Sequence, residues 1–301
     1  MEYTDVTFYS QDARICGSLA LPQPAEPRAA PGVLVLHGYT GARSEGFGDL
    51  AEVLAGAGMV ALCIDQRGSG ESGGARGHIY PLSHWLEDAH TGLSYLENHP
   101  QVEPQRLSVV GLSMGGGMAV CLAAIDPRVR CAVAMAPVGD GMDFLHSNWS
   151  RRGEAAWGEF LDRVRSAAHQ RLTYGVDHFL PLWEAMPMPS QQFEQDYRRD
   201  RQVNPLLTGE VSLASIESVL RFSPEKLCPE VHTPILFMHD PADEIVPISH
   251  SQRMHDLVRG EKHLQEMPGG GHNLVVEARK EEVYAIVRDW LRVHLIEREL
   301  A

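Results

Sequence analysis

The hydrophobic residues in the first half of the chain fall into short runs separated by longer amphipathic segments. Residues 32–36 and 59–64 are continuous apolar runs, as expected of strands that are buried on both faces of a sheet. The pattern predicts strands at 4–9, 14–21, 32–36, 59–64, 107–110 and 129–136, and helices at 47–57, 83–98 and 115–125. Strands that alternate with helices in this way indicate an α/β fold with a mostly parallel sheet. The first two strands are expected to form an antiparallel pair.

The pattern breaks after Pro137 and resumes near residue 231. Between these points the chain is rich in tryptophan, methionine and proline, and we expect it to be irregular apart from helices near 154–172 and 190–201. Afterwards strands are predicted at 234–238 and 264–267, and helices at 249–259 and 274–296. The expected organisation is therefore a core over 1–139, an insertion over 140–230 and a return to the core over 231–301.

Composition narrows the class of protein. The chain has 301 residues, of which 44% are hydrophobic and 22% charged, and its formal net charge is −14. This excludes a disordered chain, and the negative charge disfavours nucleic acid and anionic membranes as partners. Five well-separated cysteines, an N-terminus without a basic start or apolar run, and the lack of an 18-residue apolar stretch favour a soluble cytoplasmic protein.

The chemistry-bearing sequence is Gly-Leu-Ser-Met-Gly at 111–115, which stands between a predicted strand and a predicted helix. A serine on so sharp a turn has a strained backbone, and side chains at the two flanking positions would collide with neighbouring elements. This strand–turn–helix context predicts that Ser113 is a nucleophile.

A serine hydroxyl needs a base with a pKa near 7, which indicates histidine. His272 lies in a glycine-rich loop between the last predicted strand and helix, at the same edge of the sheet as Ser113. The imidazole needs a carboxylate to fix its tautomer, and Asp243 follows the strand at 234–238. Asp240 and Glu244 are rivals for this role, and Asp240 could instead cap the loop.

An acyl-transfer site also needs donors for the developing oxyanion. The backbone N–H of Met114, directly after the nucleophile, is one candidate. The second is the N–H of Tyr39, in the loop after the strand at 32–36, where Gly38 would allow close approach. We interpret His37 as a structural hydrogen-bonding residue.

Five segments occur in an order that resembles the α/β-hydrolase superfamily. They are His37-Gly38, Asp65-Gln-Arg-Gly-Ser-Gly-Glu-Ser72, Gly111-Leu-Ser-Met-Gly115, Asp243 with Val246-Pro247, and Gly271-His272. The resemblance covers about 30–139 and 230–297 and is greatest to soluble serine esterases of the feruloyl/cinnamoyl-esterase and dienelactone-hydrolase-like branch. It implies the α/β-hydrolase fold, the chain order Ser, Asp, His for the triad, and a largely helical lid at the insertion. It also implies that Asp65 and Arg67 form a structural turn. The sequence departs from the family pattern at Asp240, where glycine is common.

Aromatic and thioether side chains in the insertion could line an apolar substrate pocket or simply form the core of the lid. Met142, Trp149 and Trp183 are the substrate-binding candidates among them. No His-Glu-x-x-His sequence, phosphate-binding loop or dinucleotide fingerprint is present. We therefore expect neither a metal nor another cofactor.

The sequence predicts a serine hydrolase that cleaves a small carboxylic ester. The same three side chains could instead act on amide, thioester, lactone or carbon–carbon bonds, because fold analogy does not decide the bond. A non-catalytic binding protein on this fold is a further alternative. The sequence leaves open whether the chain is a monomer or a homodimer.

Overall fold

The apolar runs form the strands of one sheet in the computed structural model, which describes residues 2–23, 29–276 and 278–297. In the described chain, the order across the sheet is β1-β2-β4-β3-β5-β6-β9-β10. The strands are β1 (Glu2–Ser10), β2 (Ala13–Leu21), β3 (Ala30–Leu36), β4 (Val60–Ile64), β5 (Val102–Leu112), β6 (Val129–Met135), β9 (Ile235–His239) and β10 (Lys262–Glu266). The β1–β2 and β2–β4 pairs are antiparallel, and all pairs from β4 to β10 are parallel. The predicted mostly parallel sheet with an antiparallel start is confirmed.

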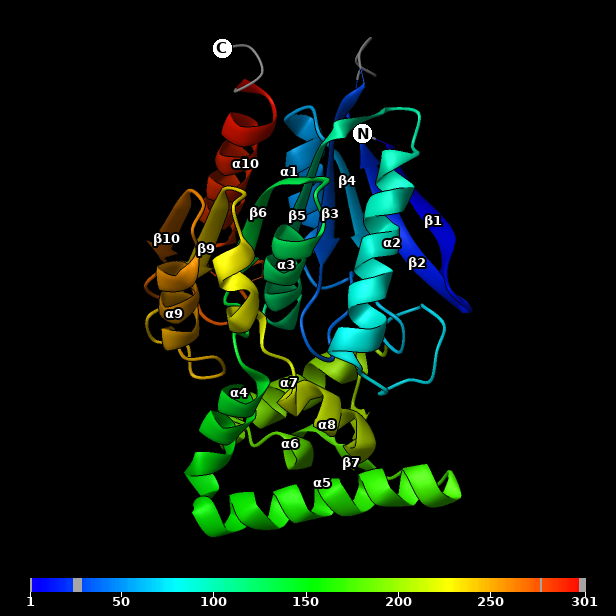
Figure 1. Ribbon diagram of the computed structural model, residues 1–301, viewed down its shortest axis with the longest axis vertical. Helices are drawn as coiled ribbons and strands as arrows, with labels where there is room; N and C mark the ends of the chain where they lie inside the picture. Colours follow the sequence, from blue (N-terminus) through cyan, green and yellow to red (C-terminus); the bar gives the residue numbers. More distant parts are fainter. Residues whose placement is uncertain (1, 24–28, 277, 298–301) are drawn as a thin grey trace.

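Helices cover both faces of the sheet (Figure 1). One face carries α1 (Phe47–Gly56) and α10 (Lys280–Leu295), and the other carries α2 (Leu86–Glu97), α3 (Met114–Ile125) and α9 (Ser249–Leu257). Alternate residues of β3 enter different cores: Val33 and Val35 pack with α1 and α10, while Leu34 and Leu36 pack on the opposite side. Because side chains alternate across a strand, the continuous apolar run supplies both cores.

The segment after β6 forms a separate layer beyond the carboxyl ends of the strands (Figure 1). Its elements are α4 (Gly141–Trp149), α5 (Glu154–Tyr174), β7 (Phe179–Pro181), α6 (Leu182–Ala185), α7 (Gln191–Val203), β8 (Glu210–Ser212) and α8 (Leu213–Leu220). Short helical turns occupy Pro81–Trp85, Ser150–Arg152 and Pro224–Glu230. We call the layer from α4 to α8 the lid.

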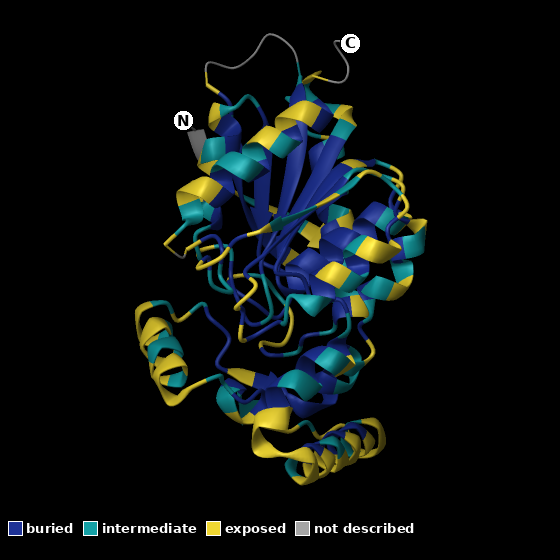
Figure 2. Cartoon of the chain, turned by 90° about the vertical axis from the view of Figure 1, so that its left-hand side faces the viewer, coloured by how far each residue is buried: buried dark blue, intermediate teal, exposed yellow. Residues whose placement is uncertain are grey.

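The lid is more regular than the sequence pattern predicts. Helices α5 and α7 lie where helices were expected, but α4, α8 and the paired strands β7 and β8 were not anticipated. In α5 the buried residues Trp157, Phe160, Val164 and Ala167 recur at helical spacing, and the outer side of the helix is exposed (Figure 2). The expectation of an insertion that is irregular outside two helices was therefore wrong, whereas the largely helical segment that the resemblance implied is present.

The last helix begins six residues later than predicted, at Lys280 instead of 274. Leu274 and Val275 are fully buried, and the Tyr284 hydroxyl donates to the Val275 carbonyl at 2.5 Å. Because that carbonyl is bound by a side chain, residues 273–276 pack as a loop and are not part of α10.

The five cysteines are all buried, and none forms a disulfide. This agrees with their prediction as small apolar core residues. Among the described residues, no helix has the length and apolar character needed to traverse a bilayer.

Candidate active site

Ser113 occupies the turn between β5 and α3, with φ 57° and ψ −117°. Its N–H donates to the Met135 carbonyl at 2.8 Å, and its own carbonyl accepts from the N–H groups of Gly117 and Val138, each at 3.0 Å. A residue in so sparsely populated a conformation costs about 1–3 kcal/mol and persists only where its surroundings fix it. These three hydrogen bonds fix it here.

The glycines beside the serine are required by crowding. A Cβ at Gly111 would lie 2.0 Å from the Gly115 carbonyl oxygen, and a Cβ at Gly115 would lie 2.4 Å from that of His37. Neither neighbour is a flexible side chain, so neither can move aside cheaply. The predicted collision at both flanking positions is confirmed.

His272 and Asp243 meet at the edge of the sheet where β9 and β10 end. The His272 Nδ1 lies 2.7 Å from Asp243 Oδ2. Asp243 Oδ1 accepts from the backbone N–H groups of Ile245 at 2.8 Å and Val246 at 3.1 Å. With a carboxylate on Nδ1, the neutral imidazole carries its hydrogen there and presents an unprotonated Nε2.

The two rival carboxylates lie in other positions. Asp240 Oδ2 accepts from the Gly271 N–H at 2.8 Å and its Oδ1 from the Ala242 N–H at 2.9 Å, so it ties the loop that carries His272 to the turn after β9. Glu244 is exposed. The structure thus gives Asp240 the loop-capping role that the sequence left open.

The electrostatics of Asp243 depend on two histidines. Burial by itself would raise the pKa of this carboxyl. The charge of His272 and hydrogen bonds from His239 and His272 outweigh burial and hold the pKa well below its usual range. Asp243 therefore stays a carboxylate at neutral pH, ready to stabilise a charged imidazole. The sequence does not single out His239, because a histidine at a strand end carries no signal of its own.

The two residues predicted to supply oxyanion donors, Met114 and Tyr39, belong to the segments next to Ser113. Met114 is the first residue of α3, and the first N–H groups of a helix have no intrahelical acceptor. Tyr39 follows Gly38, where an added Cβ would come within 3.0 Å of the Ser113 Cβ. The loop after β3 thus runs directly beside the serine. Buried His37 donates from Nδ1 to the Gly38 carbonyl at 2.8 Å and accepts at Nε2 from the Gln66 N–H at 3.1 Å, which is the structural role expected of it.

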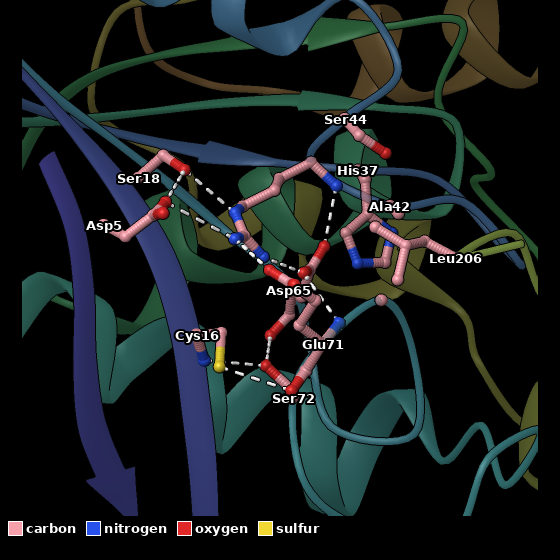
Figure 3. A network of polar contacts seen from close by, with 12 residues as sticks. Asp5, Cys16, Ser18, His37, Ala42, Ser44, Asp65, Glu71, Ser72 and Leu206 are labelled. Atoms are coloured by element: carbon pink, nitrogen blue, oxygen red, sulfur yellow. Dashed lines mark hydrogen bonds and ion pairs between the residues drawn. The ribbon is translucent and has the colours of Figure 1, made fainter. Parts of the chain in front are cut away.

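Polar contacts of the buried Asp65 hold this loop beside the end of β4 (Figure 3). Asp65 accepts from the backbone N–H of Arg43 at 2.7 Å and of Glu71 at 3.0 Å, and it also binds the Arg43 guanidinium. The Ser72 hydroxyl donates to the Asp65 carbonyl at 2.5 Å. The stretch that the resemblance assigned to a structural turn does form one. Nearby, the Arg67 guanidinium pairs with buried Asp88 at 2.6 Å.

A cavity of about 330 Å³ lies between the sheet edge and the lid, and both Ser113 and His272 line it. Apolar side chains form most of its wall: Phe47, Leu112, Phe144, Leu182, Met186, Met188, Phe193, Leu207, Ile245 and Val276. Its acidic lining residues are Glu45, Asp196 and Asp200, and its described lining includes no lysine or arginine. The cavity therefore combines an apolar wall with negative charge.

The three predicted substrate-binding residues are not among the described residues that line this cavity. Trp149 is buried in the lid, where it stacks on Phe160 with ring centroids 4.3 Å apart and donates to the Ala185 carbonyl. Trp183 lies under the Arg198 guanidinium at 3.7 Å, and Met142 is 44% exposed. Of the lid's aromatic and thioether side chains, some form its core and others line the cavity. Sequence alone did not separate the two groups.

Glu45 is one of several cavity-lining residues that the sequence did not indicate. Its Oε2 accepts from the Ala42 N–H at 3.1 Å. Burial raises the pKa of this carboxyl to about 7; the Ala42 hydrogen bond opposes the shift, and repulsion by Asp200 and Asp65 adds to it. Nothing in the local sequence distinguishes it from a surface glutamate. Among the described residues, no group of His, Cys, Asp and Glu is arranged to hold a metal ion.

A family model described as serine aminopeptidase, S33, matches residues 25–279. The chain belongs to this family of α/β hydrolases. A monoacylglycerol lipase from Mycolicibacterium smegmatis is 27% identical over 271 residues, which are 88% of this chain and 89% of the lipase.

Two solved structures show the same α/β-hydrolase fold. DcsB, in complex with its substrate analogue, superimposes with a TM-score of 0.84 at 19% identity, covering 98% of this chain and 99% of DcsB. Est1E from Butyrivibrio proteoclasticus with bound ferulic acid gives a TM-score of 0.67 at 16% identity, covering 96% and 98%. At these identities the likeness establishes the fold alone.

Gly111→Ala should destabilise the α/β-hydrolase core by about 1–3 kcal/mol, because the new methyl overlaps the Gly115 carbonyl. Gly158→Ala is the matched control. It lies inside helix α5, where the added Cβ meets nothing within 4 Å beyond the helix's own adjacent backbone, and it should be neutral or stabilise by up to about 1 kcal/mol. Urea unfolding measures both. Equal stability of the two variants would contradict the crowding argument.

Asp243→Asn should slow covalent labelling of Ser113 by a fluorophosphonate on the order of 10⁴-fold, because an amide at this position favours the wrong imidazole tautomer. Asp240→Asn should slow labelling only about tenfold, as expected from one lost hydrogen bond to the loop. Second-order labelling rates measure both effects. A similar fall in labelling rate in the two variants would contradict the assignment of Asp243 as the carboxylate that orients His272.

Proposed function

We propose that this chain is a serine hydrolase that cleaves carboxylic esters through an acyl-enzyme on Ser113. The observation that carries the proposal is the arrangement at one cavity: a strained serine turn and a histidine bound at Nδ1 by a buried carboxylate. This is the set of groups that base-assisted nucleophilic attack requires. The relationship to a monoacylglycerol lipase supports an ester as the substrate.

The proposed reaction has two halves. The Ser113 hydroxyl attacks the ester carbonyl while His272 Nε2 takes its proton, and Asp243 stabilises the resulting imidazolium. The N–H groups of Tyr39 and Met114 bind the oxyanion. His272 then gives its proton to the leaving alcohol, and a water molecule, activated by the same base, releases the acid from Ser113.

The cavity lining suggests the class of ester. Its apolar wall favours a hydrocarbon group next to the scissile carbonyl, and about 330 Å³ is enough for a small or medium chain. Glu45, Asp196 and Asp200 disfavour a carboxylate on that group, since no lysine or arginine is among the cavity's described lining residues. We therefore propose uncharged or cationic esters as substrates.

Ser113→Ala should fold normally and lose p-nitrophenyl butyrate hydrolysis on the order of 10⁶-fold, to near background. The wild type should react with a fluorophosphonate, and the variant should not. The wild type should also be assayed with an aminoacyl p-nitroanilide and with a thioester. The first substrate tests the amide bond that the family's description names, and the second tests the thioester alternative. Retention of most of the activity by the variant would disprove a nucleophile at residue 113.

The preference for cationic esters should increase with pH. As pH rises through about 7, Glu45 loses its proton and attracts positive charge in the cavity. We expect the ratio of kcat/KM for an ester whose chain ends in trimethylammonium to that for its tert-butyl isostere to rise about three- to tenfold from about pH 6 to about pH 8. Titration of the base affects both substrates and cancels in the ratio.

Glu45→Gln should make this ratio independent of pH. Asp196→Asn is the charge-matched control: it removes a carboxylate that is 40% exposed and pairs with Arg199, and it should keep the pH step. A wild-type ratio that does not change with pH would contradict the role given to Glu45.

A further inference from the structure

His239, the last residue of β9, is fully buried beside Asp243. Its Nε2 lies 2.8 Å from the Val246 carbonyl oxygen and 3.3 Å from Asp243 Oδ2. Its Nδ1 lies 2.7 Å from the Ser251 hydroxyl. Each ring nitrogen therefore has a defined partner, but the proposed reaction gives His239 no role.

The partners fix where the hydrogen of this imidazole lies. A carbonyl and a carboxylate only accept hydrogen bonds, so Nε2 must carry the hydrogen, which it donates to the Val246 carbonyl while Asp243 Oδ2 lies 3.3 Å from the same nitrogen. The Ser251 hydroxyl can donate to Nδ1 and thereby stabilises this tautomer. The resulting Nε2–H connects the turn that carries Asp243 to the end of β9.

We propose that His239 is a positioning residue for the triad: its Nε2–H holds Asp243 Oδ2 toward His272. This inference rests on the proposed function. Oδ2 is the oxygen that binds His272 Nδ1, whereas Oδ1 is occupied by two backbone N–H groups. Among the described side chains, His239 and His272 are the two that contact Asp243 Oδ2.

The arrangement also sets how strongly Asp243 acts on His272. A carboxylate that shares its charge with several donors attracts the neighbouring imidazolium less than one with fewer donors. Loss of the His239 donor should both loosen the carboxylate and leave more negative charge facing His272. The first effect lowers kcat, and the second makes His272 hold its proton to higher pH.

Two amide variants separate positioning from simple packing. The amide nitrogen of His239→Gln can occupy the place of Nε2, whereas that of His239→Asn is one methylene short of it. With p-nitrophenyl butyrate we expect His239→Asn to lower kcat about 10- to 100-fold with little change in KM, as expected for a misplaced catalytic group. The acid limb of its kcat/KM–pH profile should move to higher pH. His239→Gln should stay within a few-fold of wild type, with its profile unmoved.

Urea unfolding of both variants provides the structural control. The proposal would be overturned if His239→Asn kept wild-type kcat and an unmoved acid limb. It would also be overturned if both variants lost kcat equally and in proportion to their loss of stability. NMR of the imidazole nitrogens gives a readout that needs no turnover, since wild-type His239 should show hydrogen on Nε2 and none on Nδ1. The opposite tautomer would overturn the inference on its own. Absence of ester hydrolysis and of fluorophosphonate labelling in the wild type would instead overturn the proposed function.

Discussion

The close approach of three backbone segments around Ser113 is the constraint on which the rest of the site depends. The end of β5, the first turn of α3 and the loop after β3 come so near to one another that positions 111 and 115 have no room for a Cβ. At this crowded turn the serine lies at the edge of the sheet, and the loop that carries Tyr39 lies beside it. The strain at Ser113 is sustained by backbone hydrogen bonds to β6 and α3, so the sheet itself stabilises the turn.

The parallel order of the strands brings the other groups to the same edge. Strands β5, β6, β9 and β10 are neighbours in the sheet, and parallel strands place their carboxyl ends together. Asp243 and His272 follow β9 and β10, and the buried carboxylate of Asp240 joins these two loops through Gly271. The short hydrogen bond between Asp243 and His272 thus follows from strand order plus one capping side chain.

The parts of the structure that could be predicted are those governed by local pattern. Apolar runs and helical spacing located the core elements, and glycine spacing located Ser113, because crowding leaves a sequence signature at 111 and 115. The cavity wall could not be predicted in this way. Phe144 and Trp149 lie on the same helix, yet one faces the cavity and the other stacks on Phe160, a difference set by packing against α5. The raised pKa of Glu45 comes mainly from burial, to which Asp200 and Asp65 add repulsion, and these are contacts that only the folded chain brings together.

In the proposed function, chemistry and selectivity belong to different layers of the molecule. Ser113, Asp243 and His272 stand on the core, where backbone bonds and buried carboxylates fix their places. Much of the cavity's apolar wall comes from lid residues, of which Met188 and Phe193 are only partly buried, and lid helix α7 is mostly exposed on its outer side (Figure 2). Residues with few packing partners can change at little cost to stability. Substitutions in the lid can therefore change which substrate the protein accepts, while the proposed reacting groups keep their positions at the sheet edge.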